Sequence, residues 1–316
     1  MPELAGFPSL TCFRVFFVTW MDLLATSITS FLTVCHDITK LDIQHATFQT
    51  PHQVIALLAR LPRLEKVIVH SKMISEYSYQ TWTLPELLGP PIPPRNLQII
   101  RLHLKFRNYC WPSIFSWIVE GQSTVRMLGL GLLWGEDLPA IGTRLGTLAP
   151  VLCDLDLALM SKITAHQVET HLAPYLARLT RVTHLTLRIG CRGSMPVHWY
   201  ASLALLTALP RSPAALKTLT IFLAFDWTHL QRLDWAHLYA AVRMHTRLRF
   251  LQFRVDGRPL KSERAMEVIW KHVAPEIAAR SRFLVYFVAE LRILDAAYLE
   301  AALASFVYSP RARTTA

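Results

Sequence analysis

The sequence lacks the cysteine patterns that stabilise small secreted domains or bind zinc. Its five cysteines are an odd number, lie far apart and form no C-x-x-C pair: Cys12, Cys35, Cys110, Cys153 and Cys191. This spacing argues against a disulfide framework and against a structural zinc site, and it favours a reducing compartment. We therefore expect a cytoplasmic or nuclear protein, in which Cys153 is a small side chain buried or partly buried in a strand.

Long uninterrupted apolar runs are also missing, although 52% of the residues are hydrophobic. The apolar stretch 13–32 is interrupted by an arginine and an aspartate, and the uncharged stretch 193–210 contains prolines and a histidine. Neither is a clean span of about 20 apolar residues. The start of the chain has no basic segment followed by a small-residue cleavage site, so we expect neither a membrane span nor a signal peptide.

The motifs of common enzymes are absent. The sequence contains no P-loop, no H-E-x-x-H zinc motif and no G-x-S-x-G nucleophile motif. Gly129-Leu130-Gly131 lacks the third glycine of a dinucleotide fingerprint and lies inside a predicted strand. Aromatic and basic residues do not interleave on one face, as they would on a platform for nucleic acid. We therefore predict that the protein is not an enzyme, needs no cofactor and binds no nucleic acid.

Acidic residues are scarcer than basic ones. The chain has 22 Asp and Glu against 33 Lys and Arg, which gives a net charge of +11 and an isoelectric point near 9.7. Such an excess of positive charge favours acidic partners or nucleic acid. Because the basic residues are scattered along the chain, a basic but merely soluble surface is the simpler interpretation.

A six-residue frame of the form L-x-x-L-x-L is what the sequence does contain, and it recurs along the whole chain. The segment Leu152-Cys153-Asp154-Leu155-Asp156-Leu157 shows it most clearly, and positions one, four and six are apolar or aromatic in every copy. The copies begin at Leu10, Ile38, Leu64, Leu97, Val125, Leu152, Val182, Leu216, Leu248 and, more loosely, Phe283. Self-similarity at a period near 30 residues is typical of a solenoid, in which stacked repeats share one core.

Helical segments with recognisable first turns separate the frames. Thr50-Pro51-His52-Gln53 and Thr164-Ala165-His166-Gln167 are predicted capping boxes. Asp234 and Asp295 are predicted N-caps of two later helices. The helix after Thr164 is expected to continue through Leu176.

Parallel strands that are joined by helices stack into a curved sheet with the helices outside. We therefore predict a single α/β solenoid over residues 1–309, a horseshoe with about ten parallel strands on the concave face and helices on the convex face. Residues 310–316 are predicted to be a disordered tail. An irregular proline-rich insertion is predicted at 71–96, where the repeat rhythm is interrupted.

Within this insertion, Gly89-Pro90-Pro91-Ile92-Pro93-Pro94 has to be extended or polyproline-like. A stiff loop that closes an enlarged repeat is the simpler interpretation of this segment. A P-x-x-P ligand for a proline-recognising domain is the other.

The frame is similar to a leucine-rich repeat of the long, helix-containing type. Together with the junction Leu61-Pro62-x-Leu64-x-x-Val67 and the segment Ala278-Ala279-Arg280-Ser281-Arg282, it resembles the repeat region of the large fungal F-box family. The resemblance implies a protein-interaction module that serves as the substrate-recognition arm of an F-box-type ubiquitin ligase receptor. The first frame leaves no room for an F-box before it, so the ligase adaptor is an expected partner only if an F-box lies upstream.

Positions three, five and seven of each frame alternate with the core positions, so their side chains are predicted to stand on the concave face. With about 4.8 Å between neighbouring strands, Asp154 should lie beside His184, and Asp156 should be within diagonal reach of Arg188. Three interpretations remain open: a surface network of opposite charges, a hot spot of a protein-binding surface, or a hydrolase or metal-dependent site around Asp154, Asp156 and His184. No serine or cysteine nucleophile aligns with these residues.

The protein-binding hypothesis centres on the middle of the concave face. Gly129 and Gly131 are expected either to leave this area open, so that a partner could approach the backbone closely, or merely to ease the curvature of the sheet. The predicted binding residues around them are Arg101, His103, Asp154, Asp156, His184 and Arg188. The predicted partner is a protein, with acidic proteins favoured by the net charge; no metal and no membrane are expected at this surface.

Overall fold

The computed structural model describes residues 10–16, 35–48, 51–72, 92–103, 110–120, 124–159, 162–190, 195–209, 216–224, 230–256, 265, 267–272 and 284–290. These residues build strands and helices that alternate along most of the chain. The predicted cap Thr50, the predicted helix at 296–307, the tail at 310–316 and residues 73–91 of the insertion lie outside the described residues.

The strands form one parallel ten-stranded sheet in which sequence order is also spatial order. They are β1 (Cys12–Phe16), β2 (Lys40–Thr47), β3 (Lys66–Lys72), β4 (Ile99–His103), β5 (Met127–Leu133), β6 (Asp154–Leu159), β7 (His184–Gly190), β8 (Thr218–Ala224), β9 (Phe250–Asp256) and β10 (Leu284–Glu290). Each of the first nine begins at position three of a predicted frame. The Cα pairing from Cys12 through Phe250 also joins position three of one frame to position three of the next. The predicted spacing of the repeats is therefore confirmed in nine copies.

The tenth frame was placed one residue too late. Leu284 pairs with Phe250, so the frame that matches the other nine begins at Arg282 and not at Phe283. The sequence from Phe283 to Val288 is apolar or aromatic throughout, so positions four and six fit the pattern in two adjacent registers, and only Arg282 at position one departs from it in the observed one. A shift of one residue exchanges the two faces of a strand, and therefore the pairing rather than the pattern decides the register.

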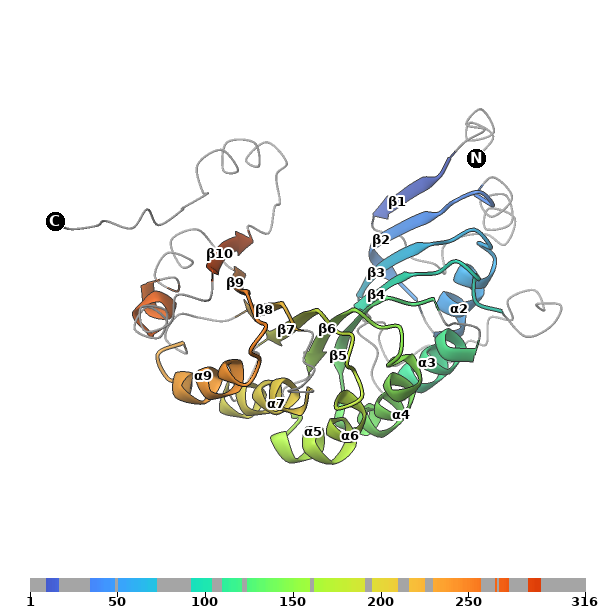
Figure 1. Cartoon of the computed structure of the whole chain (residues 1–316). Coiled ribbons are helices and arrows are strands. Elements are labelled where there is room, and N and C mark those ends of the chain that lie inside the picture. Colours follow the sequence, from blue (N-terminus) through green and yellow to red (C-terminus); the bar gives the residue numbers. More distant parts are fainter. Residues whose placement is uncertain are drawn as a thin grey trace, which may run out of the picture.

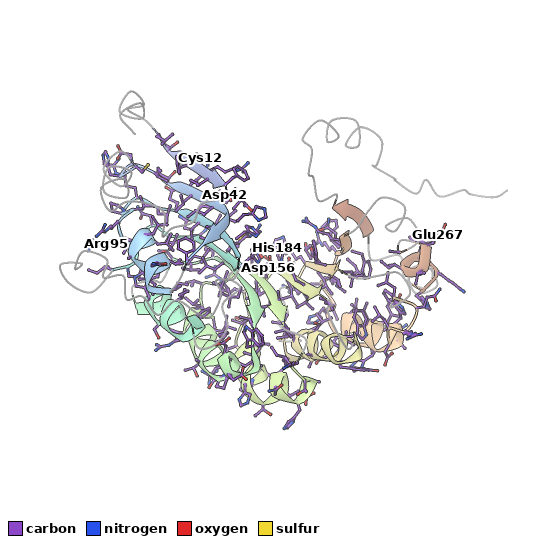
Figure 2. The ribbon with its side chains drawn as sticks, turned by 180° about the vertical axis from the view of Figure 1, so that it is seen from behind. Cys12, Asp42, Arg95, Asp156, His184 and Glu267 are labelled. Carbon is purple, nitrogen blue, oxygen red and sulfur yellow. The ribbon has the colours of Figure 1, made fainter. Side chains whose placement is uncertain are left out.

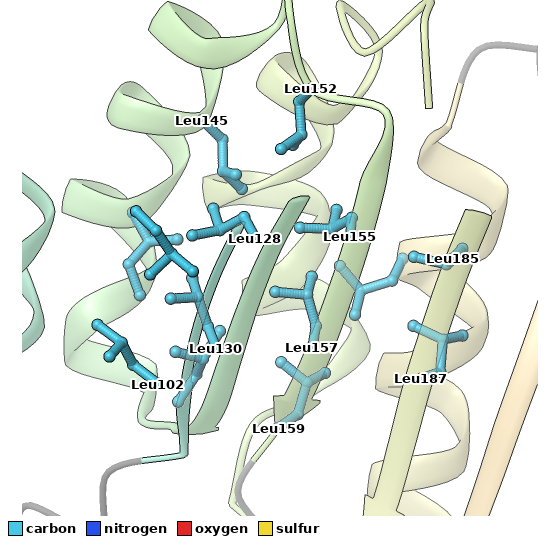
Figure 3. Close-up of a cluster of buried hydrophobic side chains, with 14 of the residues drawn as sticks. Leu102, Leu128, Leu130, Leu145, Leu152, Leu155, Leu157, Leu159, Leu185 and Leu187 are labelled. Atoms are coloured by element: carbon cyan, nitrogen blue, oxygen red, sulfur yellow. The ribbon is translucent and has the colours of Figure 1, made fainter. Parts of the chain in front are cut away.

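The core is built from positions one, four and six of the frames. From the second to the ninth copy, these side chains are at most 4% exposed, with Leu64, Leu97, Val125, Leu152 and Leu155 completely buried. Figure 3 shows leucines of β5, β6 and β7 gathered in one layer with Leu145 of the adjacent helix. Because burying one leucine contributes about 1.5–3 kcal/mol, this shared layer holds neighbouring repeats together.

The helices cover the outer side of the curved sheet, while the strands line its inner side (Figure 1). They are α2 (Pro51–Ala59), α3 (Cys110–Glu120), the 3₁₀ turn η3 (Gly135–Asp137), α4 (Leu138–Leu148), α5 (Ala165–His171), α6 (Ala173–Leu176), α7 (Met195–Ala208) and α9 (Trp235–Arg243). The arrangement is thus a solenoid-like α/β fold with a single open parallel sheet. Among the helices of the described ranges, none is long and apolar enough to cross a membrane.

Two predicted helix caps are confirmed. The backbone N–H of Gln167 donates to Thr164 Oγ1 at 3.2 Å, and the backbone N–H of Thr164 donates to Gln167 Oε1 at 3.0 Å, which completes a capping box. The backbone N–H of His237 donates to Asp234 Oδ1 at 2.9 Å and caps α9. Each cap fixes the point at which the chain leaves the sheet and turns into the outer layer.

The helix that was expected to run from Ala165 through Leu176 is divided in two. Helix α5 ends at His171, and α6 begins at Ala173 after Leu172. The reason is Pro174, which has no N–H to donate to the preceding turn and whose ring crowds the carbonyl four residues earlier. Leu172 and Leu176 are both buried in spite of the break, so the apolar face is retained.

Candidate functional site

The concave face carries the polar side chains of the sheet. Figure 2 shows Asp156 and His184 near the middle of the sheet, with Asp42 further along the arm formed by the first strands. Within the described residues, the predicted set Arg101, His103, Asp154, Asp156, His184 and Arg188 comes from β4, β6 and β7. Strand β5 lies between β4 and β6 and contributes only the small residues Gly129 and Gly131 at positions five and seven.

Asp156 and Arg188 form the ion pair that the strand spacing predicts. Arg188 Nε donates to Asp156 Oδ1 at 2.8 Å, and Arg188 Nη2 donates to Asp156 Oδ2 at 2.8 Å. This two-point contact runs diagonally, because Asp156 is paired with Thr186 and Arg188 is paired with Ala158. The diagonal reach predicted from the sequence is confirmed, and the planar fork of arginine fits it well.

The carboxylate of this pair is more deeply placed than a surface network would require. Asp156 is only 2% exposed, whereas the side chain of Arg188 is 29% exposed. The guanidinium group also lies over the ring of Phe222, with 5.2 Å between its carbon and the ring centroid. Asp156 and the Phe222 ring thus hold the guanidinium group of Arg188 on the concave face, while part of the side chain stays exposed.

The open hollow expected at Gly129 and Gly131 is filled by neighbouring side chains. Both glycines are buried. A Cβ atom on Gly129 would lie 3.0 Å from Arg101 Cγ, and one on Gly131 would lie 2.8 Å from His103 Cα and 2.9 Å from its Nδ1. The glycines therefore allow Arg101 and His103 to lie across β5 toward β6, rather than leaving backbone free for a partner.

Two histidines on neighbouring strands stack at this point. The ring centroids of His70 and His103 are 4.5 Å apart, with an angle of 23° between the planes. Burial, and then the positive charge of Arg188, lower the pKa of His103 to about 3. Burial lowers the pKa of His70 as well, assisted by Arg188. Both rings are therefore neutral at physiological pH and offer hydrogen-bonding nitrogens without charge.

Arg101 has no fixed acceptor for its Nε atom. That atom is buried, and none of the described residues accepts a hydrogen bond from it. The positive charge of Arg101 acts on Asp154, where it opposes the larger effect of burial, which raises the pKa of that carboxyl group. Arg101 thus combines a positive charge with an unsatisfied donor, and unsatisfied buried donors are rare in folded proteins.

Asp154 and His184 are direct Cα partners, as predicted, but no hydrogen bond joins their side chains, although both are among the described residues. His184 is exposed, and its Nδ1 lies 2.8 Å from Thr183 Oγ1. The Thr183 hydroxyl group in turn donates to the Cys153 carbonyl at 3.2 Å. Because that hydroxyl proton is already directed to a carbonyl, the histidine is the donor in the contact and does not activate Thr183 as a nucleophile.

The hydrolase or metal-dependent alternative would require Asp154, Asp156 and His184 to act together. Within the ranges that the structure describes, no group of three or more His, Cys, Asp and Glu side chains lies together in a way that could hold a metal ion. Asp156 is committed to Arg188, and His184 to Thr183.

Two members of the cluster, His70 and Phe222, were not among the predicted site residues. Both occupy position seven of their frames, in register with His103 and Arg188 respectively. The signal that could have found them is a histidine at position seven of two successive frames, and an aromatic residue directly beside Arg188. The chain matches no protein-family model and no curated protein, so the site has to be interpreted from its own geometry.

Proposed function

We propose that the protein is a protein-recognition module that binds its partner on the concave face, centred on Arg101, His103, Asp154, Asp156, His184 and Arg188. The observation that carries the proposal is the positively charged Arg101, whose buried Nε has no acceptor, beside two neutral histidines and a fixed arginine. The Arg101 side chain as a whole is only partly buried, so a carboxylate of a partner can pair with its positive charge.

Preorganisation supports this proposal. The cluster stands on β4, β6 and β7 of one sheet, and Arg188 is held by both Asp156 and the Phe222 ring. Side chains that are already fixed lose little freedom on binding, which lowers the cost of association. Arginine and aromatic residues are also the types that contribute most often to interface hot spots.

The repeating strand and helix units support the narrower proposal that this is a leucine-rich repeat array related to fungal F-box receptors. In that role, the concave face is the substrate-recognition arm of a cytoplasmic or nuclear ubiquitin ligase. Retention of the ligase adaptor by the full natural protein tests this role. If the adaptor is not retained, the ligase role is abandoned, while recognition by the concave face can still be measured.

The experiment for the binding surface begins with proximity labelling to recover a partner, followed by measurement of its affinity. Arg101→Glu and His184→Ala are expected to weaken binding by more than about tenfold, or about 1.4 kcal/mol. Arg232→Glu is the control. Arg232 is exposed and lies after the end of β8, just before α9, so it is not one of the concave-face residues. A deletion of residues 90–94 tests the proline-rich segment. The proposal is abandoned if the deletion abolishes binding while both concave-face variants stay within about threefold of the wild type.

A further inference from the structure

The positive charge of the chain is concentrated in one region. Residues 170–255 contain eleven Lys and Arg but only two Asp and Glu, a net charge of +9 out of +11 for the whole chain. Between Glu169 and Asp226 there is no acidic residue at all. In this region the basic residues are therefore not balanced by acidic neighbours in the sequence.

Several of these cations, together with Arg126, lie along the edge of the sheet at which the strands begin. Arg126, Lys217 and Arg249 are at position two of their frames, and Arg181 and Arg247 directly precede frames. All five are exposed, and we call this set the basic edge. Backbone hydrogen bonds connect position two of successive repeats, including Lys217 N–H to the Thr183 carbonyl at 2.8 Å and Arg249 N–H to the Lys217 carbonyl at 2.8 Å. The backbone hydrogen bonds between successive repeats thus hold these cations in one row.

The basic edge has no carboxylate partner in the described part of the chain. Elsewhere, Arg14 pairs with Asp42, Arg63 with Asp37 and Arg188 with Asp156. On the basic edge, Arg181 donates to the carbonyl of Pro150, a neutral acceptor. Complementing a helix dipole does not explain these cations, because that effect is confined to the last turn of a helix, and α6 and α9 end at Leu176 and Arg243.

We infer that the basic edge is a second interaction surface, which binds an acidic polypeptide segment in extended conformation. From β5 to β9 the edge crosses four strand spacings, or about 19 Å, the length of about six extended residues. Such a segment presents every second side chain to one side, about 7 Å apart, so alternating acidic residues all face the edge. The inference does not rest on the concave site, because none of the five residues belongs to it.

A polypeptide fits the edge better than a single-stranded nucleic acid does. Bases need aromatic side chains on which to stack. Among the described residues, the large exposed hydrophobic side chains are Phe16, Ile92, Tyr200 and Trp270. None of them stands at a strand start between β5 and β9, so the edge offers charge without a stacking surface.

The test uses the purified full chain and a fluorescent peptide of about twelve residues with alternating Glu and Ser, at low ionic strength. The expected result is saturable binding that Lys217→Glu/Arg249→Glu weakens by about tenfold or more, and Lys217→Gln/Arg249→Gln by a smaller factor. Arg232→Glu, which makes the same charge change as a single Lys217→Glu reversal but away from the edge, should leave binding within about twofold, whereas Lys217→Glu should weaken it by more. Thermal melting checks that each variant is folded.

Three results overturn the inference. The first is no binding of the Glu-Ser peptide by the wild type. The second is equal weakening by Arg232→Glu and by a single Lys217→Glu reversal, which would mean that only net charge matters. The third is tighter binding of a thymidine oligonucleotide of the same charge than of the peptide. The Gln-Ser peptide, which has no charge, should not bind.

Discussion

At the scale of single residues, the Asp156–Arg188 pair is the most constrained feature of the concave face. Asp156→Ala removes a 2%-exposed acceptor and leaves a partly buried guanidinium group unpaired. Removing one partner of a fully buried pair costs about 3–5 kcal/mol, and the partial exposure of Arg188 reduces this to about 1–3 kcal/mol. Urea unfolding measures the loss.

A double-mutant cycle shows whether the two side chains act as a pair. Asp156→Ala, Arg188→Ala and the double variant should give a coupling free energy above about 0.5 kcal/mol, because residues in direct contact are not additive. Strict additivity of the two single losses would mean that the ion pair contributes nothing beyond its separate packing. Thr186→Ala, at a position that faces the same side of β7, is a suitable control for local disturbance.

His103 gives a prediction for pH dependence. Its pKa is about 3 in the folded protein against an ordinary value of 6.5, so between these values the unfolded chain binds the proton and the folded chain does not. Stability therefore falls as the pH is lowered through this window, by up to about 1.4 kcal/mol per pH unit from this residue. His103→Gln should remove that part of the slope in urea unfolding at about pH 8, 6 and 5. Parallel slopes for wild type and variant would contradict the burial of a neutral ring.

The sequence predicted which residues face one another across the strands, but not how deeply each is placed. The alternation of side chains along a strand predicted that Asp156 faces the concave side, and the distance between strands predicted that it lies near Arg188. Both predictions are correct. The same reasoning left Gly129 and Gly131 open, because alternation says nothing of where long neighbouring side chains lie. Arg101 and His103 fill that space, and their direction depends on packing with the whole face.

At the scale of helices and strands, the contact between α4 and the α5–α6 segment depends on one glycine. A Cβ atom on Gly142 would overlap the His171 carbonyl oxygen and would lie 2.7 Å from Tyr175 Cδ2. Gly142→Ala is therefore expected to destabilise the protein by about 1–3 kcal/mol, since the clash is with backbone as well as with a ring. Thermal or urea unfolding gives the difference.

Gly146 on the same helix is the matched control. A Cβ atom there would lie 3.0 Å from Tyr175 Cδ1, a contact that the side chain can relieve. Alanine also favours a helix over glycine by about 1 kcal/mol, so Gly146→Ala should stay within about 1 kcal/mol of the wild type. Equal losses for the two substitutions would show that the close approach at His171 is unimportant.

The sequence predicted the strands better than the helices between them. Nine strands begin where the frames place them, because each frame has three apolar positions that must enter one core. Pro174 divided the helix that the apolar spacing through Leu172 and Leu176 had indicated as continuous. Leu172 and Leu176 still share the buried face, but the helical hydrogen bonds are not continuous from α5 to α6.

At the scale of the whole molecule, the parallel strands form one sheet in chain order with helices along its outer side (Figure 1). Each repeat packs against its neighbours, so the inner face is a long surface of regularly spaced side chains. The polar cluster lies in the middle of that surface and the basic edge along one border of it. Fold alone does not specify a partner, and these two sets of side chains are what a partner can distinguish.

Photo-cross-linking from three exposed positions measures directly which face a recovered partner touches. A photoreactive amino acid is placed at His184 on the concave face, at Tyr200 on helix α7 or at Ile92 beside the proline-rich segment, where the native side chains are all exposed. Recognition by the concave face predicts that the partner is cross-linked from position 184 and not from position 200 or 92. Cross-linking from position 200 or 92 with none from position 184 would contradict it.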